Sequence, residues 1–123
     1  YPIAFRWIEE QKERGREEGI VQTIIGRPKV LPVVGDFSKA HGEIDQGYME
    51  RCAVNWPIQA SGAEDTKGAI NKLDEADADI RIPIHDEVVL DGEYDLSGFG
   101  LEETIPGIRI PIDTDRIERW MKV

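Results

Sequence analysis

The first third of the chain combines one strongly charged stretch with short runs of branched apolar residues. An apolar start at residues 3–8 leads into a charged run over residues 9–18 that ends at Gly19, and this pattern predicts a helix. Residues 20–31 place a Gly-Arg-Pro turn between two short runs rich in Ile and Val. Such an arrangement predicts a β-hairpin.

The middle of the chain changes from irregular to helical patterning. Residues 33–47 contain scattered Gly and Asp with no apolar period, so we expect a loop with at most a short helical turn. Helical patterning returns over residues 48–54 and again over residues 60–73. Because Pro57 lies between the two segments and lacks a backbone N–H, we expect it to kink or restart the helix.

Strand patterning dominates the last third of the chain. Residues 80–90 form two apolar segments around a polar His-Asp-Glu triplet, which predicts an antiparallel hairpin with the triplet near its turn. Residues 91–107 are rich in Gly and are expected to form a connection. Ile recurs at alternate positions over residues 108–112, which predicts a last strand.

A short terminal helix is expected after that strand, beginning at a cap formed by Thr114 or Asp115 and running through Lys122. Together the predicted elements place helices before a small antiparallel sheet. The predicted fold class is therefore α+β.

Composition limits the functions that the chain can have alone. Its 123 residues contain 15 Lys and Arg against 25 Asp and Glu, a net charge of −10, which argues against a basic nucleic-acid coat. Residues 1–60 hold 8 basic and 9 acidic side chains, whereas residues 61–123 hold 7 and 16. No apolar run approaches the roughly 20 residues of a membrane span, and the single cysteine, Cys52, fits a reducing cytoplasm.

The first candidate for chemistry is the triplet His85, Asp86 and Glu87. Adjacent carboxylates near a hairpin turn are costly to bury unpaired, and hard oxygen ligands of this kind suit Mg²⁺ or Mn²⁺. The competing interpretation is a polar turn in an acidic protein, with His85 as an incidental turn residue.

The second candidate is the set Arg51, Asn55 and Gln59, which recur every four residues in an otherwise apolar or small stretch. Helical geometry places them on one side, where Arg can contact phosphate and the two amides can probe the minor-groove edge of a base pair. A kinked helix whose polar groups satisfy the local backbone is the alternative. The chain has no phosphate-binding Gly-Lys-Ser/Thr loop, dinucleotide fingerprint or Gly-x-Ser-x-Gly elbow.

Two segments, residues 50–59 (ERCAVNWPIQ) and residues 84–90 (IHDEVVL), resemble motifs of the family A DNA polymerases, the group of bacterial polymerase I and phage replicases. Their order and approximate spacing also agree with that family. Upstream, residues 1–19 and the Gly-Arg and Leu-Pro pairs of residues 26–32 resemble its fingers helix and the following hairpin. The likeness extends over most of residues 1–90.

This resemblance implies part of a right-hand polymerase, with residues 1–48 as a distal portion of the fingers and residues 49–123 as the C-terminal portion of the palm. It implies two Mg²⁺ ions that are shared with a carboxylate outside this chain, and primer-template DNA and a dNTP as partners. Position by position, it implies metal binding by Asp86 and Glu87, a place beside the primer 3′ end for His85, and contacts along the primer-template for Arg51, Asn55 and Gln59.

Several features depart from the family pattern. Residues 91–107 are too short and too rich in Gly for the long helix that the family places there, and residues 33–50 are longer than usual. These departures favour a compact, phage-type relative. Because the chain begins at Tyr1, we expect a missing N-terminal polymerase portion that is either a second chain or a lost segment.

The hypothesis from sequence is therefore a DNA-directed DNA polymerase fragment or subunit that performs two-metal nucleotidyl transfer only when it is assembled with that missing portion. A non-catalytic scaffold remnant of a polymerase, with the acidic half as its partner surface, is the alternative from another class. A third interpretation is an acidic Mg²⁺-binding domain that is unrelated to polymerases.

Overall fold

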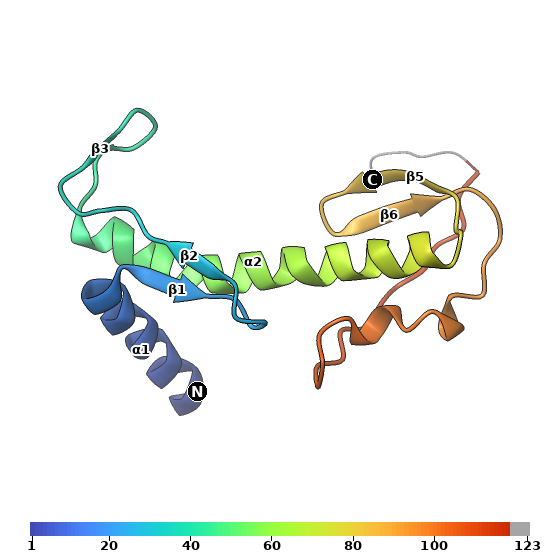
Figure 1. The fold of residues 1–123 in the computed structure, drawn as a ribbon, viewed down its shortest axis with the longest axis horizontal. Helices are drawn as coiled ribbons and strands as arrows, with labels where there is room; N and C mark the ends of the chain where they lie inside the picture. Colours follow the sequence, from blue (N-terminus) through green and yellow to red (C-terminus); the bar gives the residue numbers. More distant parts are fainter. Residues whose placement is uncertain (119–123) are drawn as a thin grey trace. The chain divides into compact units, whose positions relative to one another are not determined.

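The computed structural model describes residues 1–118 and divides the chain into two compact units, residues 1–64 and the residues from Asp65 onward. Helices are combined with two-stranded antiparallel sheets, so the predicted α+β class is confirmed (Figure 1). None of the helices in the described residues is long and apolar enough to cross a membrane.

The first unit begins with helix α1, Pro2–Glu18, which matches the predicted helix and extends it to the N-terminal end of the chain. Proline suits the first turn because its missing N–H has no intrahelical partner there. The helix ends where Gly19 adopts a left-handed conformation, with φ of 67°, and donates its N–H to the carbonyl of Gly15 at 3.1 Å.

The predicted hairpin after this helix is confirmed. Strand β1 (Ile20–Gln22) pairs antiparallel with β2 (Pro28–Val30), and Val21 lies opposite Lys29. Val21 is fully buried, while its neighbours Ile20 and Gln22 are exposed. The alternation of strand side chains therefore turns one face of the hairpin toward the core.

A small core joins α1 and this hairpin to the following helix. The cluster contains Val21, Leu31, Met49, Cys52 and Ala53. Gly15 of α1 packs so closely on this cluster that a Cβ atom there would lie 3.0 Å from Ala53 Cβ, Leu31 Cδ1 and Met49 Sδ. The close packing at this position favours glycine, because a larger residue would force these neighbours to shift.

The segment expected to be a loop contains a minimal hairpin. Strands β3 (Phe37–Ser38) and β4 (Gly42–Glu43) pair antiparallel. Neither strand is long enough to produce a detectable period in the sequence, which explains why patterning predicted only irregular structure here.

Helix α2, Gln46–Glu75, replaces the two predicted helical segments. It begins after Asp45, whose carboxylate accepts the N–H of Tyr48 at 2.7 Å. The expected restart at Pro57 is wrong, because the helix is continuous through this residue. The hydroxyl of Ser61 donates to the Pro57 carbonyl at 2.5 Å.

The second unit contains the end of α2 and a hairpin of β5 (Ile80–Ile84) with β6 (Glu87–Leu90), as predicted. Two short 3₁₀ helices follow, η1 (Leu96–Gly98) and η2 (Leu101–Glu103). The core of this unit is the cluster of Leu73, Ala78 and Leu101, with partly buried side chains of both strands and of η1 packed against it.

The predicted last strand over residues 108–112 is wrong. Only an isolated bridge joins Ile105 to Ile108, and the N–H of Ile110 bonds the carbonyl of Glu102 at 2.9 Å. Within the described residues no strand pairs with residues 108–112, and Pro111 also lacks the N–H that a ladder needs. Residues 113–118 are not helical, and the rest of the predicted terminal helix lies outside the described residues.

Candidate functional site

Three polar side chains of α2 lie on one exposed strip of the helix. Arg51, Asn55 and Gln59 are all exposed, and successive members are separated by about 40° around the axis because each residue of an α-helix advances by about 100°. The opposite side carries the buried residues Ala53 and Pro57. The structure therefore brings the three predicted residues of this set together on a face that a ligand can reach.

Arg51 and Asn55 also line a shallow hollow of about 340 Å³ between the start of α2 and α1. Lys12 contributes from α1, while Gln59 does not line this hollow. Apolar contacts from Ile8 and Val54 complete much of its surface. Sequence analysis did not identify Lys12, because it is one of many charges on a solvated helix.

A polar contact fixes α1 to the start of α2 beside this hollow. The Glu50 carboxylate accepts from Arg16 Nη1 at 2.6 Å and from Gln46 Nε2 at 2.9 Å. The hydrogen bond from Gln46 and then that from Arg16 lower the pKa of Glu50, because both stabilise its charged form. The Glu50 carboxylate is thus paired with protein groups, whereas the side chain of its neighbour Arg51 makes no hydrogen bond or ion pair with the described residues.

The turn of the β1–β2 hairpin is fixed to α2 close to Gln59. The N–H of Ile24 donates to the Ser61 hydroxyl at 2.9 Å, and Arg27 Nε lies 3.5 Å from Glu64 Oε1. The carboxylate oxygen atoms of Glu64 are buried and accept no hydrogen bond from the described residues, so Arg27 is the charge that faces them. Sequence patterning gave no signal for these contacts, because they join residues 37 positions apart.

The second candidate set lies at the turn of the β5–β6 hairpin. Ile84 pairs with Glu87, so His85 and Asp86 form a two-residue turn between the strands. His85 has φ of 50°, a left-handed conformation that is uncommon for residues with a side chain. All three polar residues are exposed, as expected for a turn that presents them to solvent or to a ligand.

Both candidate sets lack protein partners within the described residues. The side chains of Arg51, Asn55 and Gln59 make no hydrogen bond or ion pair there, and neither do those of His85, Asp86 and Glu87. Other charges near them are paired, including Glu50 with Arg16 and Arg81 with Asp79 and Asp91. The six predicted residues are therefore free to bind a ligand.

The oxygen atoms of Asp86 and Glu87 suit a hard cation such as Mg²⁺. No group of three or more His, Cys, Asp or Glu side chains within residues 1–118 is arranged to hold a metal ion. Mg²⁺ commonly takes only one or two protein carboxylates and completes its shell with water and phosphate oxygens. The donor set fits a shared Mg²⁺ site and does not fit an all-protein cage.

Comparisons with known proteins agree on one family. The sequence profile of DNA polymerase family A matches residues 1–96. The thermostable DNA polymerase I of Thermus thermophilus is 34% identical over 99 residues, which are 77% of this chain and 11% of that protein. The DNA polymerase I of Pseudomonas aeruginosa is 32% identical over 115 residues, or 89% of this chain and 12% of that protein.

A solved structure supports the same relationship. The POL domain of Pol1 from M. smegmatis, in complex with DNA primer-template and dNTP, matches with a TM-score of 0.58 and 26% sequence identity. The match covers 80% of this chain and 18% of that one. The chain thus spans about one ninth of the length of these curated relatives, which are bacterial, and likeness to the phage group stays a prediction.

Proposed function

Because this chain belongs to DNA polymerase family A, we propose that it supplies part of the fingers and the C-terminal part of the palm of a DNA-directed DNA polymerase. The observation that carries this proposal is that the six candidate residues of the two family motifs are exposed and make no hydrogen bond or ion pair with the described residues, although several charges near them are paired. Exposed side chains without protein partners contribute little to the stability of the fold, so these six positions are available for a ligand.

In the proposed enzyme, Arg51, Asn55 and Gln59 contact the primer-template near the newest base pair. Their strip on α2 offers one cation for phosphate and two amides with both donors and acceptors for base edges. The near balance of charge in residues 1–60, a net of −1, permits a polyanion to approach this unit more easily than the acidic remainder of the chain.

Asp86 and Glu87 would hold Mg²⁺, with Asp86 as the principal ligand and His85 beside the primer 3′ end. The chemistry that two bound Mg²⁺ ions supply in this family is activation of the primer hydroxyl and stabilisation of the pyrophosphate leaving group. The hairpin turn exposes both carboxylates to solvent, where they could bind a cation. Neither forms an ion pair with a lysine or arginine of the described residues.

The proposal includes assembly with a further polymerase portion, because the two adjacent carboxylates of one turn cannot hold two ions and a carboxylate from outside this chain is needed. Exposed large apolar side chains in the first unit support such an assembly. Among them are Ile3 and Phe5 of α1, with exposed fractions of 78% and 70%, and Val30 of β2 with 71%. Apolar surface of this kind is typical of an interface with another part of a protein.

The test is primer extension by the assembled enzyme with Asp86→Ala, and with Asp113→Ala as a matched control in the same unit. Asp113 is exposed and makes no hydrogen bond or ion pair with the described residues. We expect Asp86→Ala to abolish nucleotide addition without loss of assembly, and Asp113→Ala to extend primers normally. Near-normal extension by the Asp86 variant would contradict the proposed function.

Gln59→Ala provides a second, smaller test. It removes a probe of base-pair geometry and leaves the metal ligands in place, so we expect roughly tenfold poorer discrimination against mismatched primer ends. Asn71→Ala, an exposed amide later on α2, is the matched control and should leave discrimination unchanged.

A non-catalytic scaffold role is the second candidate. The exposed apolar side chains and the acidic residues 61–123 favour it, since both features suit a protein partner. This role predicts that the assembled complex binds its partner equally well with Asp86→Ala and never extends a primer. The activity of the unaltered assembly therefore distinguishes the two functions.

A further inference from the structure

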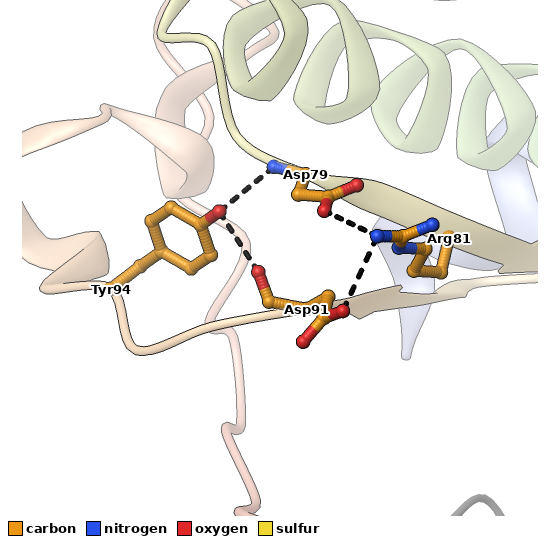
Figure 2. A network of polar contacts seen from close by, with 4 residues as sticks. All are labelled: Asp79, Arg81, Asp91 and Tyr94. Atoms are coloured by element: carbon orange, nitrogen blue, oxygen red, sulfur yellow. Dashed lines mark hydrogen bonds and ion pairs between the residues drawn. The ribbon is translucent and has the colours of Figure 1, made fainter.

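A network of four residues closes the open end of the β5–β6 hairpin, opposite the turn that carries Asp86 (Figure 2). Arg81 Nη2 donates to Asp79 Oδ2 at 2.7 Å and to Asp91 Oδ2 at 3.3 Å, so one guanidinium joins both sides of the hairpin. The Tyr94 hydroxyl accepts the N–H of Asp79 at 2.9 Å and donates to the carbonyl of Asp91 at 3.0 Å. The N–H of Asp91 donates to the carbonyl of Asp79 at 2.9 Å.

The pairing between the two strands of this hairpin is short and irregular. It has only two strands, and such a sheet is marginally stable in isolation. Pro83 in β5 has no N–H for the ladder, and the pairing shifts between Ile80 and Ile82. Arg81 is the extra residue at that bulge, and a bulge locally disrupts the ladder and redirects the side chains around it.

We propose that Arg81 and Tyr94 are positioning residues that fix the register of the β5–β6 hairpin and thereby the place of Asp86. A slip of one residue would move every strand side chain to the opposite face and would change which residues form the turn. The proposal rests on the proposed function, because it assigns a purpose to the position of the Asp86 carboxylate.

Two further features support a positioning role for Tyr94. Its ring packs against the core cluster of Leu73, Ala78 and Leu101, and this packing holds the hydroxyl in place. Gly92 has φ of 113°, and a Cβ atom there would lie 3.4 Å from the Tyr94 ring. The chain therefore turns tightly after β6 and brings the hydroxyl back to both strands.

An ordinary surface role predicts something different. Exposed ion pairs contribute little to stability, and the side chains of Arg81, Asp79 and Asp91 are 58%, 47% and 66% exposed. If the network were only surface charge pairing, its removal would leave the hairpin and the turn unchanged. The tests must therefore measure the hairpin directly as well as catalysis.

The first test is amide hydrogen exchange of β6 in the 123-residue chain. Arg81→Met removes the guanidinium and keeps an unbranched stem, whereas Tyr94→Phe removes only the hydroxyl. We expect exchange of the Glu87–Leu90 amides to rise about threefold to fivefold for each variant, and more for the pair of changes. Arg81→Lys keeps the charge but not the planar guanidinium with its several donors, so its β6 amides should be better protected from exchange than those of Arg81→Met.

Arg109→Met is the matched control for this test. Arg109 also pairs with a carboxylate of the same unit, Glu102, at 2.8 Å, and it makes no hydrogen bond or ion pair with residues 80–90. Its loss should leave exchange of β6 unchanged. Equal exchange of β6 in Arg81→Met and Arg109→Met would overturn the register role whether or not the assembly is a polymerase.

The second test is steady-state extension by the assembled enzyme over a range of Mg²⁺ concentrations. We expect Tyr94→Phe to lower kcat about fivefold and to raise the Mg²⁺ concentration for half-maximal rate, with the KM for primer-template unchanged. A rate and Mg²⁺ dependence equal to those of the unaltered enzyme, despite faster exchange of β6, would overturn the link to Asp86. An unaltered assembly that extends no primer would instead contradict the proposed function, while the exchange test still decides the register role.

Discussion

Arg51, Asn55 and Gln59 stand on a thirty-residue helix whose other side is packed against a hairpin and α1, whereas Asp86 and Glu87 stand at the turn of two short strands. Packing of apolar side chains fixes the first set, because the exposed strip and the buried side belong to the same rigid helix. The second set lies at the end of the hairpin farthest from its polar network. We infer that the two units position their candidate residues by different physical means.

The largest expected effects come from truncations in the two hydrophobic cores, and they test whether the two units unfold separately. Leu31 and Leu73 are 4% and 3% exposed, one in each unit. Truncation of either to Ala should lower the free energy of unfolding by about 2–5 kcal/mol, through lost burial and the cavity that remains. Hydrogen exchange should show the loss mainly in residues 1–64 for Leu31→Ala and mainly beyond residue 65 for Leu73→Ala. Equal loss throughout the chain in both variants would mean that the two units unfold as one.

The next effect tests the close packing of the first unit. Gly15→Val places a branched side chain where a Cβ atom already meets three side-chain atoms at 3.0 Å. Overpacking of this kind should cost about 1–3 kcal/mol in denaturant unfolding. Gly62→Ala is the control, because a Cβ atom at this helical glycine meets nothing within 4 Å and should stabilise the helix by about 0.5–1 kcal/mol. A destabilised Gly62 variant together with an unaffected Gly15 variant would contradict the packing of α1 on α2.

A third effect tests the dependence of the second unit on polar contacts. The Thr104 hydroxyl donates to the Asp65 carboxylate and so ties the end of η2 to α2. Thr104→Val keeps the shape and removes the donor, and it should cost about 1.5–3 kcal/mol because the acceptor is charged. The matched change in the first unit is Thr23→Val, which removes an acceptor for the N–H of Arg27 and should cost only about 1 kcal/mol. If thermal unfolding shows a larger loss of stability for Thr23→Val than for Thr104→Val, the second unit does not depend on polar contacts more than the first.

Local signals in the sequence were sufficient for the elements that are defined by neighbouring residues. Gly19 ends α1 as predicted, and the triplet at residues 85–87 occupies a hairpin turn as predicted. Sequence patterning could not show whether α2 continues through Pro57. The Ser61 hydroxyl donates a hydrogen bond to the Pro57 carbonyl and accepts one from the N–H of Ile24, and the second of these joins residues 37 positions apart.

The candidate site was predictable in its residue types but not in its supports. The family motifs contain the six site residues, and helical spacing placed three of them on one side of α2. Whether these six residues are exposed and unpaired depends on where the rest of the chain lies. A local sequence pattern does not contain this information. The network of Arg81 and Tyr94 joins residues that look ordinary in sequence, and the alternating Ile residues at 108–112 lacked a strand with which to pair.

The smallest expected effect is the acid sensitivity of the contact between α1 and α2. Hydrogen bonds from Gln46 and Arg16 lower the pKa of Glu50 below the ordinary value of a Glu side chain, about 4.3. A carboxylate whose folded pKa is lowered stabilises the protein above the unfolded pKa, and this contribution is lost as the pH falls through the folded value. Thermal unfolding of the unaltered chain and of Glu50→Gln should therefore differ at pH 6, and the difference should shrink as the pH falls through the lowered pKa of Glu50.

Glu102→Gln is the matched control for the acid effect in the second unit. Its pKa is lowered by the hydrogen bond from Arg109 and by that from the N–H of Ile112, so the sign of its pH dependence is the same. Only Glu50 borders the hollow that Arg51 and Asn55 line, so only Glu50→Gln should alter DNA affinity of the assembled enzyme. If both variants change DNA affinity equally, the change in net charge explains the effect. The contact between α1 and α2 would then not be what positions Arg51, Asn55 and Gln59.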